Sequence, residues 1–139
     1  ATAVSLDDLL QESDFVSLHV PLTDETRHMI GSREIALMKE TAILVNTARG
    51  GVIEQGTLVA ALRQGRPAMA ALDVTSVEPI DSQDELLALP NVIITPHIAS
   101  ASVATRLRMA NMAIDNLLAG LSGALLPNCA NLEVYQEKK

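Results

Sequence analysis

Three residues have side chains suited to reducing a carbonyl group, and they stand at or near the ends of apolar runs. Arg49 follows the run 42–48 and precedes two glycines, which let the backbone turn sharply and let a ligand approach closely. A guanidinium there can bind a carboxylate through two parallel hydrogen bonds. His97 follows the run 91–95 and a proline, and histidine is the usual residue for proton exchange near neutral pH.

Glu78 lies in the segment after the third apolar run and directly before Pro79. If folding brings its carboxylate to the imidazole of His97, it orients the ring and favours the imidazolium form, which makes a general acid. Each residue also has a plain structural interpretation: a surface arginine in a turn, a structural histidine and a solvated glutamate. Asp73, at the end of the third run, either accepts hydrogen bonds from an amide-bearing ligand or caps the next turn.

Apolar runs alternate with helical patterns at short spacing along most of the chain. The runs 14–20, 42–48, 69–74 and 91–95 predict strands, and the almost wholly apolar second run is typical of strands covered by helices on both faces. Helices are expected after a cap at Ser5, over 33–38 after a cap at Ser32, over 54–64 and over 100–118. The buried side of the last helix is expected to hold Met109, Met112, Ala113, Ile114 and Leu117.

This alternation is typical of an α/β fold with a doubly wound parallel sheet. In such sheets functional side chains collect at the carboxyl ends of the strands, so the polar residues that end the four runs are predicted to meet at one edge. His19 is expected to be half-buried within its strand, and His28 is expected to be exposed. No metal-ligand spacing and no Walker loop occur in the sequence.

Composition narrows the classes of partner. The 139 residues are 48% hydrophobic and carry 10 basic and 17 acidic side chains, a formal charge of −7. That charge disfavours nucleic acid and anionic membrane surfaces as partners. The single cysteine, Cys129, fits a reducing compartment and so a cytoplasmic location, and no apolar run has the length of a membrane span.

Four motifs in order give the sequence a more specific signature than any single residue. They are SDFVSLHVPLTDETRHMIG, MKETAILVNTARGGVIEQGTLVAAL, ALDVTSVEP and LPNVIITPHIAS. Together they closely resemble the D-isomer-specific 2-hydroxyacid dehydrogenases, most of all the glyoxylate/hydroxypyruvate and 2-ketogluconate reductase type. The resemblance implies an oxidoreductase that transfers a hydride between NAD or NADP and a small 2-oxoacid, and that acts as a homodimer.

The resemblance also implies roles for individual residues. Arg49 matches the arginine that binds the substrate carboxylate and carbonyl, His97 the acid/base, and Glu78 its carboxylate partner. The positions that match cofactor contacts are Val20, Pro21, Thr47, Ala48, Arg49, Asp73, His97 and Ala99. Among these, Asp73 matches the aspartate that holds the nicotinamide carboxamide.

The sequence departs from the family's pattern at its N-terminal side. It contains no G-x-G-x-x-G loop, so the first βαβ unit and the substrate domain of the family are expected to be missing. Residues 1–120 are then part of an NAD(P)-binding domain, and residues 121–139 form a tail that returns to the substrate domain. The chain alone is expected to be inactive.

Two other functions remain open at this point. One is a non-catalytic, corepressor-like binding module on the same scaffold, and the other is a related formate or phosphonate dehydrogenase. The retained trio of Arg49, Glu78 and His97 favours the hydroxyacid enzyme over both. The sequence decides neither the oxoacid nor the choice between NAD and NADP.

Overall fold

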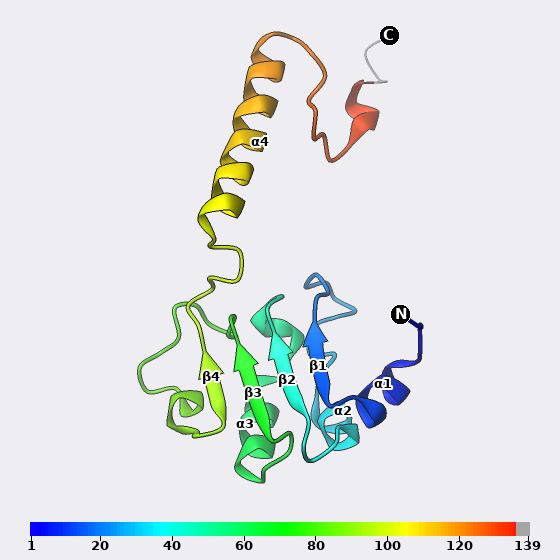
Figure 1. Ribbon diagram of the computed structural model, residues 1–139, viewed down its shortest axis with the longest axis vertical. Coiled ribbons are helices and arrows are strands. Elements are labelled where there is room, and N and C mark those ends of the chain that lie inside the picture. Colours follow the sequence, from blue (N-terminus) through cyan, green and yellow to red (C-terminus); the bar gives the residue numbers. More distant parts are fainter. Residues whose placement is uncertain (136–139) are drawn as a thin grey trace. The chain divides into compact units, whose positions relative to one another are not determined.

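The computed structural model describes residues 1–135 (Figure 1). Its contacts divide the chain into two compact units, Ala1–Ile98 and Ala99–Lys139. The domain boundary expected at residue 120 stays a prediction, and this residue lies near the end of a helix in the second unit. Residues 136–139 of the expected C-terminal tail lie outside the described residues.

The first unit is a parallel α/β structure, as the alternation of apolar runs and helical patterns predicts. Its strands are β1 (Phe15–Leu18), β2 (Ile43–Asn46), β3 (Met69–Leu72) and β4 (Val92–Ile94). They pair in the order β1-β2-β3-β4, and their arrows point the same way in Figure 1. The helices are α1 (Leu6–Glu12), α2 (Ser32–Leu37) and α3 (Gln55–Arg63), and the short 3-10 turns are η1 (Gly50–Val52) and η2 (Glu85–Ala88).

Helices cover one face of the sheet. Because side chains alternate along a strand, one residue in two faces the core. In the register of the sheet, Leu44 lies beside Val16 and Ala70, and all three are buried. These strand residues form a single apolar cluster with the inward side chains of the three helices, which include Leu10, Ile35, Leu58 and Leu62.

Side chains on the face of the sheet opposite α1, α2 and α3 are exposed or partly buried. Phe15, Met69 and Ile93 are exposed, and the exposed fraction of Phe15 is 70%. Ile43 and Val45 on the same face are only partly buried. The near-continuous apolar sequence of these strands fits a sheet covered on both faces. Within the first unit, the helices α1, α2 and α3 pack on one of them.

The helix ends follow local capping chemistry. Ser5 caps α1 as predicted, because its hydroxyl accepts a hydrogen bond from the Asp8 amide. The prediction that Ser32 caps α2 is wrong, because the helix begins at Ser32 itself. The carboxylate of Glu34 reaches back 3.1 Å to the amide of Gly31, so the acid supplies the cap.

The second unit contains the longest helix, α4 (Val103–Leu121), and the 3-10 turn η3 (Leu132–Tyr135). Ser102 caps α4, so the helix begins later than the predicted start at residue 100. None of the residues of α4 is buried, so the expected buried side at Met109, Met112, Ala113, Ile114 and Leu117 is not found. Within the unit, the side chain of Asn116 accepts a hydrogen bond from the Asn128 amide at 2.9 Å.

No helix within residues 1–135 has both the length and the hydropathy of a membrane span. Even α4, with 19 residues, does not combine that length with enough apolar character to cross a bilayer.

The difference in burial between the two faces of the sheet predicts that alanine substitutions on them change the free energy of unfolding by different amounts. Leu44→Ala removes a fully buried side chain and should lower the free energy of unfolding by about 2–5 kcal/mol. Phe15→Ala removes a larger side chain from the face opposite the helices, where Phe15 is exposed. It should change the free energy of unfolding by only about 0.5 kcal/mol. Urea denaturation of the 139-residue chain measures both. Equal losses would mean that the second face is covered in solution.

Candidate active site

The segments that follow the strands are joined by backbone hydrogen bonds beyond the strand ends. The amide of Asp73 donates to the carbonyl of Asn46 at 2.9 Å, and the amide of Thr95 donates to the carbonyl of Leu72 at 2.9 Å. The amide of His97 then donates to the carbonyl of Asp73 at 3.0 Å. The polar residues after β2, β3 and β4 therefore lie side by side at the carboxyl edge of the sheet.

His97 and Glu78 form a hydrogen-bonded pair at this edge. The Nδ1 atom of His97 lies 2.7 Å from Oε2 of Glu78, and both side chains keep contact with solvent, at 48% and 38% exposure. The other carboxylate oxygen of Glu78 accepts the amide hydrogen of Thr75 at 3.2 Å. One carboxylate thus fixes the ring of His97 and is itself fixed by the loop backbone.

His97 has a left-handed backbone conformation, with φ of 54°, which is uncommon for a residue with a side chain. Asp73 supports it from the neighbouring strand end. The buried carboxylate of Asp73 accepts the Ile98 amide at 2.9 Å and the hydroxyl hydrogen of Thr95. These hydrogen bonds lie in the turn after β4 and not in the turn after the strand of Asp73 itself. The expected contact of Asp73 with a cofactor amide stays a prediction.

The turn that carries Arg49 is held by the buried side chain of Asn46. Its amide nitrogen donates to the carbonyl of Arg49 at 3.0 Å, and its oxygen accepts the amide of Ala48 at 3.0 Å. The guanidinium of Arg49 is exposed and donates to the carbonyl of Ala48 at 2.7 Å. Asn46 therefore defines the direction in which the arginine leaves the sheet.

A close backbone contact joins the Arg49 turn to the segment that leads to Glu78. A Cβ atom added at Gly50 would overlap the carbonyl group of Thr75 and approach the nitrogen of Ser76 to 2.6 Å. Only glycine permits this approach. The separation between the arginine turn and the Glu78 loop is therefore set by backbone atoms of both segments.

Two cavities of about 580 Å³ each open at this edge. One lies at the ends of β1 and β2 and is lined by His19, Val20, Pro21, Leu22, Thr47, Ala48 and Arg49. The other is lined by Asp73, Thr75, Glu78, His97 and a group of apolar side chains that includes Ile80 and Leu87. Arg49 and His97 thus line different cavities in this structure.

The first of these cavities holds several of the residues predicted to contact the cofactor, and their contact with it stays a prediction. Its volume lies in the range of small-molecule sites, and Val20, Pro21 and Ala48 offer apolar surface to a flat ring beside the hydroxyl of Thr47. These are four of the residues predicted to contact the cofactor. Ala99 belongs to the second unit, so its predicted place beside the cofactor stays a prediction.

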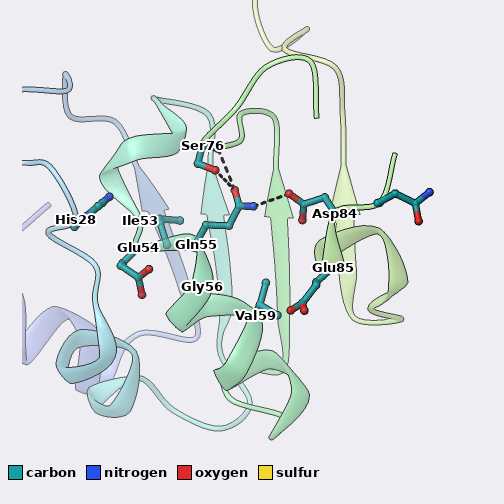
Figure 2. A pocket seen from close by; sticks show the side chains of 10 residues that line it. His28, Ile53, Glu54, Gln55, Gly56, Val59, Ser76, Asp84 and Glu85 are labelled. Atoms are coloured by element: carbon teal, nitrogen blue, oxygen red, sulfur yellow. Dashed lines mark hydrogen bonds between the residues drawn. The ribbon is translucent and has the colours of Figure 1, made fainter. Parts of the chain in front are cut away.

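A third cavity, of about 480 Å³, lies beside the start of α3 (Figure 2). Its carboxylates already have partners: Glu54 caps α3 through the amide of Thr57, and Glu85 lies 3.2 Å from the guanidinium of Arg63. Asp84 accepts a hydrogen bond from the side chain of Gln55. Among the described residues no group of three or more His, Cys, Asp or Glu is placed to hold a metal ion.

The other two histidines, His19 and His28, are not part of the pair of His97 and Glu78. His28 is exposed, as predicted. The prediction that His19 is half-buried is wrong: this residue follows the end of β1 and is exposed, and its Nε2 lies 2.8 Å from the hydroxyl of Ser17. Asn46 and Thr95 are among the strand-end residues predicted to meet at this edge, but the sequence indicated no role for them, and Gln55 was missed.

The fold and the edge residues define a class of protein: a parallel α/β nucleotide-binding domain with a histidine–carboxylate pair at the carboxyl ends of its strands. The family model described as "D-isomer specific 2-hydroxyacid dehydrogenase, NAD binding domain" matches residues 1–99. The chain belongs to this family, and its resemblance to it is confirmed.

Relatives and solved structures agree with this family. Glyoxylate reductase of Aeropyrum pernix is 55% identical over 135 residues, which are 97% of this chain and 40% of that protein. The TT0316 protein of Thermus thermophilus superposes with a TM-score of 0.88 at 50% identity, over 92% of this chain and 41% of that one. D-lactate dehydrogenase of Lactobacillus jensenii with NAD+ gives a TM-score of 0.84 at 31% identity, over 92% and 42%. The chain therefore spans about 40% of the length of the relatives it matches.

The Gly50 contact predicts that two adjacent glycines respond differently to alanine. Gly50→Ala forces backbone apart and should lower the free energy of unfolding by about 1–3 kcal/mol. Gly51→Ala is the control, because its Cβ would meet only the flexible ends of side chains, Leu22 at 3.2 Å and Arg27 at 3.7 Å. A change of about 0.5 kcal/mol or less is expected. Denaturation and the amide chemical shifts of Thr75 and Ser76 measure the difference. Equal behaviour of the two variants would contradict the contact.

Proposed function

We propose that this chain is the part of an NAD(P)-dependent D-2-hydroxyacid dehydrogenase that carries the acid/base pair. The complete protein would reduce a small 2-oxoacid such as glyoxylate or hydroxypyruvate to the D-2-hydroxyacid. The observation that carries the proposal is the 2.7 Å contact between Nδ1 of His97 and Oε2 of Glu78. A non-catalytic binding module has no need of a proton-donating pair, so this contact favours the enzyme.

In the proposed reaction Arg49 binds the carboxylate of the oxoacid and polarises its carbonyl group. The nicotinamide cofactor, when bound, supplies the hydride that adds to the carbonyl carbon. His97 gives its proton to the carbonyl oxygen as the hydride arrives. Because Nδ1 of His97 is engaged by Glu78, the proton is transferred from Nε2. The negative charge of Glu78 stabilises the imidazolium before the transfer.

The cofactor would lie along the cavity at the ends of β1 and β2. Val20, Pro21, Thr47 and Ala48 line that cavity and would contact it. Asp73 and Ala99 would lie at its nicotinamide end, as their match to the family's motifs implies. Of the two cofactors, either NAD or NADP is compatible with these contacts. We further propose that the complete protein is a homodimer and is located in the cytoplasm. Light scattering of the complete protein tests the dimer.

The first test measures which residue transfers the proton. In the complete enzyme that contains this chain, His97→Gln should lower kcat/KM for the oxoacid about 10²–10⁴-fold, because general acid catalysis is lost. His28→Gln is a matched control, since His28 is also exposed and has the same φ of 54°. Its kcat/KM should stay close to that of the parent. Equal rates for His97→Gln and the parent would refute the assigned role.

The second test identifies the substrate and separates the competing functions. The complete protein is assayed for reduction of a panel of 2-oxoacids with NADH and NADPH. It is also assayed for oxidation of formate and phosphite with NAD+ and NADP+. Reduction of oxoacids alone supports the proposal, and oxidation of formate or phosphite would overturn it. The 139-residue chain contains no glycine-rich loop to bind the pyrophosphate, so we expect no steady-state turnover from it alone.

A further inference from the structure

The loop that carries Glu78 has little regular structure to hold it in place. It runs from the end of β3 to the 3-10 turn η2, and Ser76, Val77 and Glu78 within it are exposed. A carboxylate can orient the ring of His97 only if its own position is fixed. The contacts that fix this loop therefore decide how well the pair is formed.

One side chain outside the loop binds it on both sides of Glu78. The oxygen of Gln55 accepts the amide hydrogen of Ser76 at 3.0 Å and lies 2.8 Å from its hydroxyl, which donates to it. The amide nitrogen of Gln55 donates to Oδ2 of Asp84 at 2.9 Å. Figure 2 shows Gln55 extended between these two residues.

Gln55 is a firm anchor because it is the first residue of α3. That helix is capped by Glu54, whose carboxylate accepts the amide of Thr57 at 2.7 Å, and it packs into the core through Leu58 and Leu62. The cap does not use the side chain of Gln55. Replacing that side chain should therefore release the loop and leave the helix intact.

The two points that Gln55 binds are themselves parts of ordered turns. Asp84 uses its other oxygen to accept the amide of Leu86 at 2.9 Å, which begins η2. Next to Ser76, the amide of Thr75 donates to Oε1 of Glu78, and its carbonyl lies against Gly50. The loop is thus held from the α3 side by Gln55 and from the arginine turn by Gly50.

We propose that Gln55 is a positioning residue for the acid/base pair. It acts through the loop: by holding Ser76 and Asp84, it keeps the carboxylate of Glu78 against Nδ1 of His97. This inference rests on the proposed function for its catalytic consequence, but its structural part concerns the chain alone. The two parts can therefore fail separately.

The structural part is tested by amide hydrogen exchange on the 139-residue chain. In Gln55→Ala the amide of Thr75, which bonds to Glu78, should exchange at least about tenfold faster, and the ring resonances of His97 should shift. Gln55→Glu keeps an acceptor for Ser76 but repels Asp84, so an intermediate effect is expected. Gln64→Ala places the same change at the exposed end of α3 and should leave Thr75 unchanged.

The catalytic part is tested in the complete enzyme. Gln55→Ala should lower kcat about tenfold and change KM for the oxoacid less than about twofold, because the loop it holds bears Glu78 and not Arg49. Gln55→Glu should recover part of that loss, and Gln64→Ala should match the parent. A uniform loss of stability would also lower the apparent kcat at unchanged KM, because less of the enzyme is folded. The kcat of each variant is therefore expressed per folded enzyme, and a loss of about tenfold that remains after this correction supports the positioning role.

Each outcome bears on one part. Unchanged exchange of Thr75 in Gln55→Ala, or in Gln55→Glu should the alanine variant not fold, overturns the inference. Faster exchange with unchanged kcat also overturns the positioning role. If the amide of Thr75 exchanges faster in Gln55→Ala but the complete protein reduces no 2-oxoacid, the proposed function is overturned instead. Gln55 then remains the residue that holds the loop.

Discussion

The last residues of the four strands lie side by side in one row across the sheet, and every segment of the candidate site begins at the next residue. The register pairs Leu18 with Asn46 and Asn46 with Leu72, and Leu72 with Ile94. Because the strands are parallel, this row places the beginnings of all four following segments at one edge. Hydrogen bonds from Asp73 and Thr95 extend the ladder by one further step. A shift of one residue between two strands would turn the polar residue of one segment to the opposite face of the sheet.

Beyond that row the chain is held by polar side chains more than by apolar packing. Backbone groups in the loops have no ladder partners, and buried ones need substitutes. Asn46 supplies them for the arginine turn, Asp73 for the turn at His97, and Gln55 for the loop that carries Glu78. The left-handed backbone of His97 persists because Asp73 accepts hydrogen bonds from the amides of both His97 and Ile98. A direct consequence is that small changes far from the reacting groups can move them.

The sequence predicted the sheet better than the residues that hold the site. Apolar runs locate all four strands, and strand direction follows from the short α/β spacing. The pairing of Glu78 with His97 followed only from a resemblance, because no local pattern predicts where an exposed loop carboxylate points. Asn46 left one signal, a lone amide in an apolar run. Gln55 left none, since a polar residue at the start of a helix is ordinary. The burial expected for α4 failed for a different reason: helical periodicity identifies an apolar side and not what covers it.

The two cavities at the carboxyl edge of the sheet separate Arg49 from His97 and Glu78. In the proposed reaction a 2-oxoacid would contact Arg49 with its carboxylate and His97 with its carbonyl oxygen. These two side chains line separate cavities in the structure, and the guanidinium of Arg49 donates to the carbonyl of Ala48. The Gly50 contact fixes how far apart the two backbones lie, so movement of the long arginine side chain is the inexpensive adjustment. A substrate carboxylate offers the guanidinium two charge-assisted hydrogen bonds in place of the one it makes to a carbonyl. Under the proposed function, binding of the substrate carboxylate would therefore favour the rotation that brings the arginine toward His97 and Glu78.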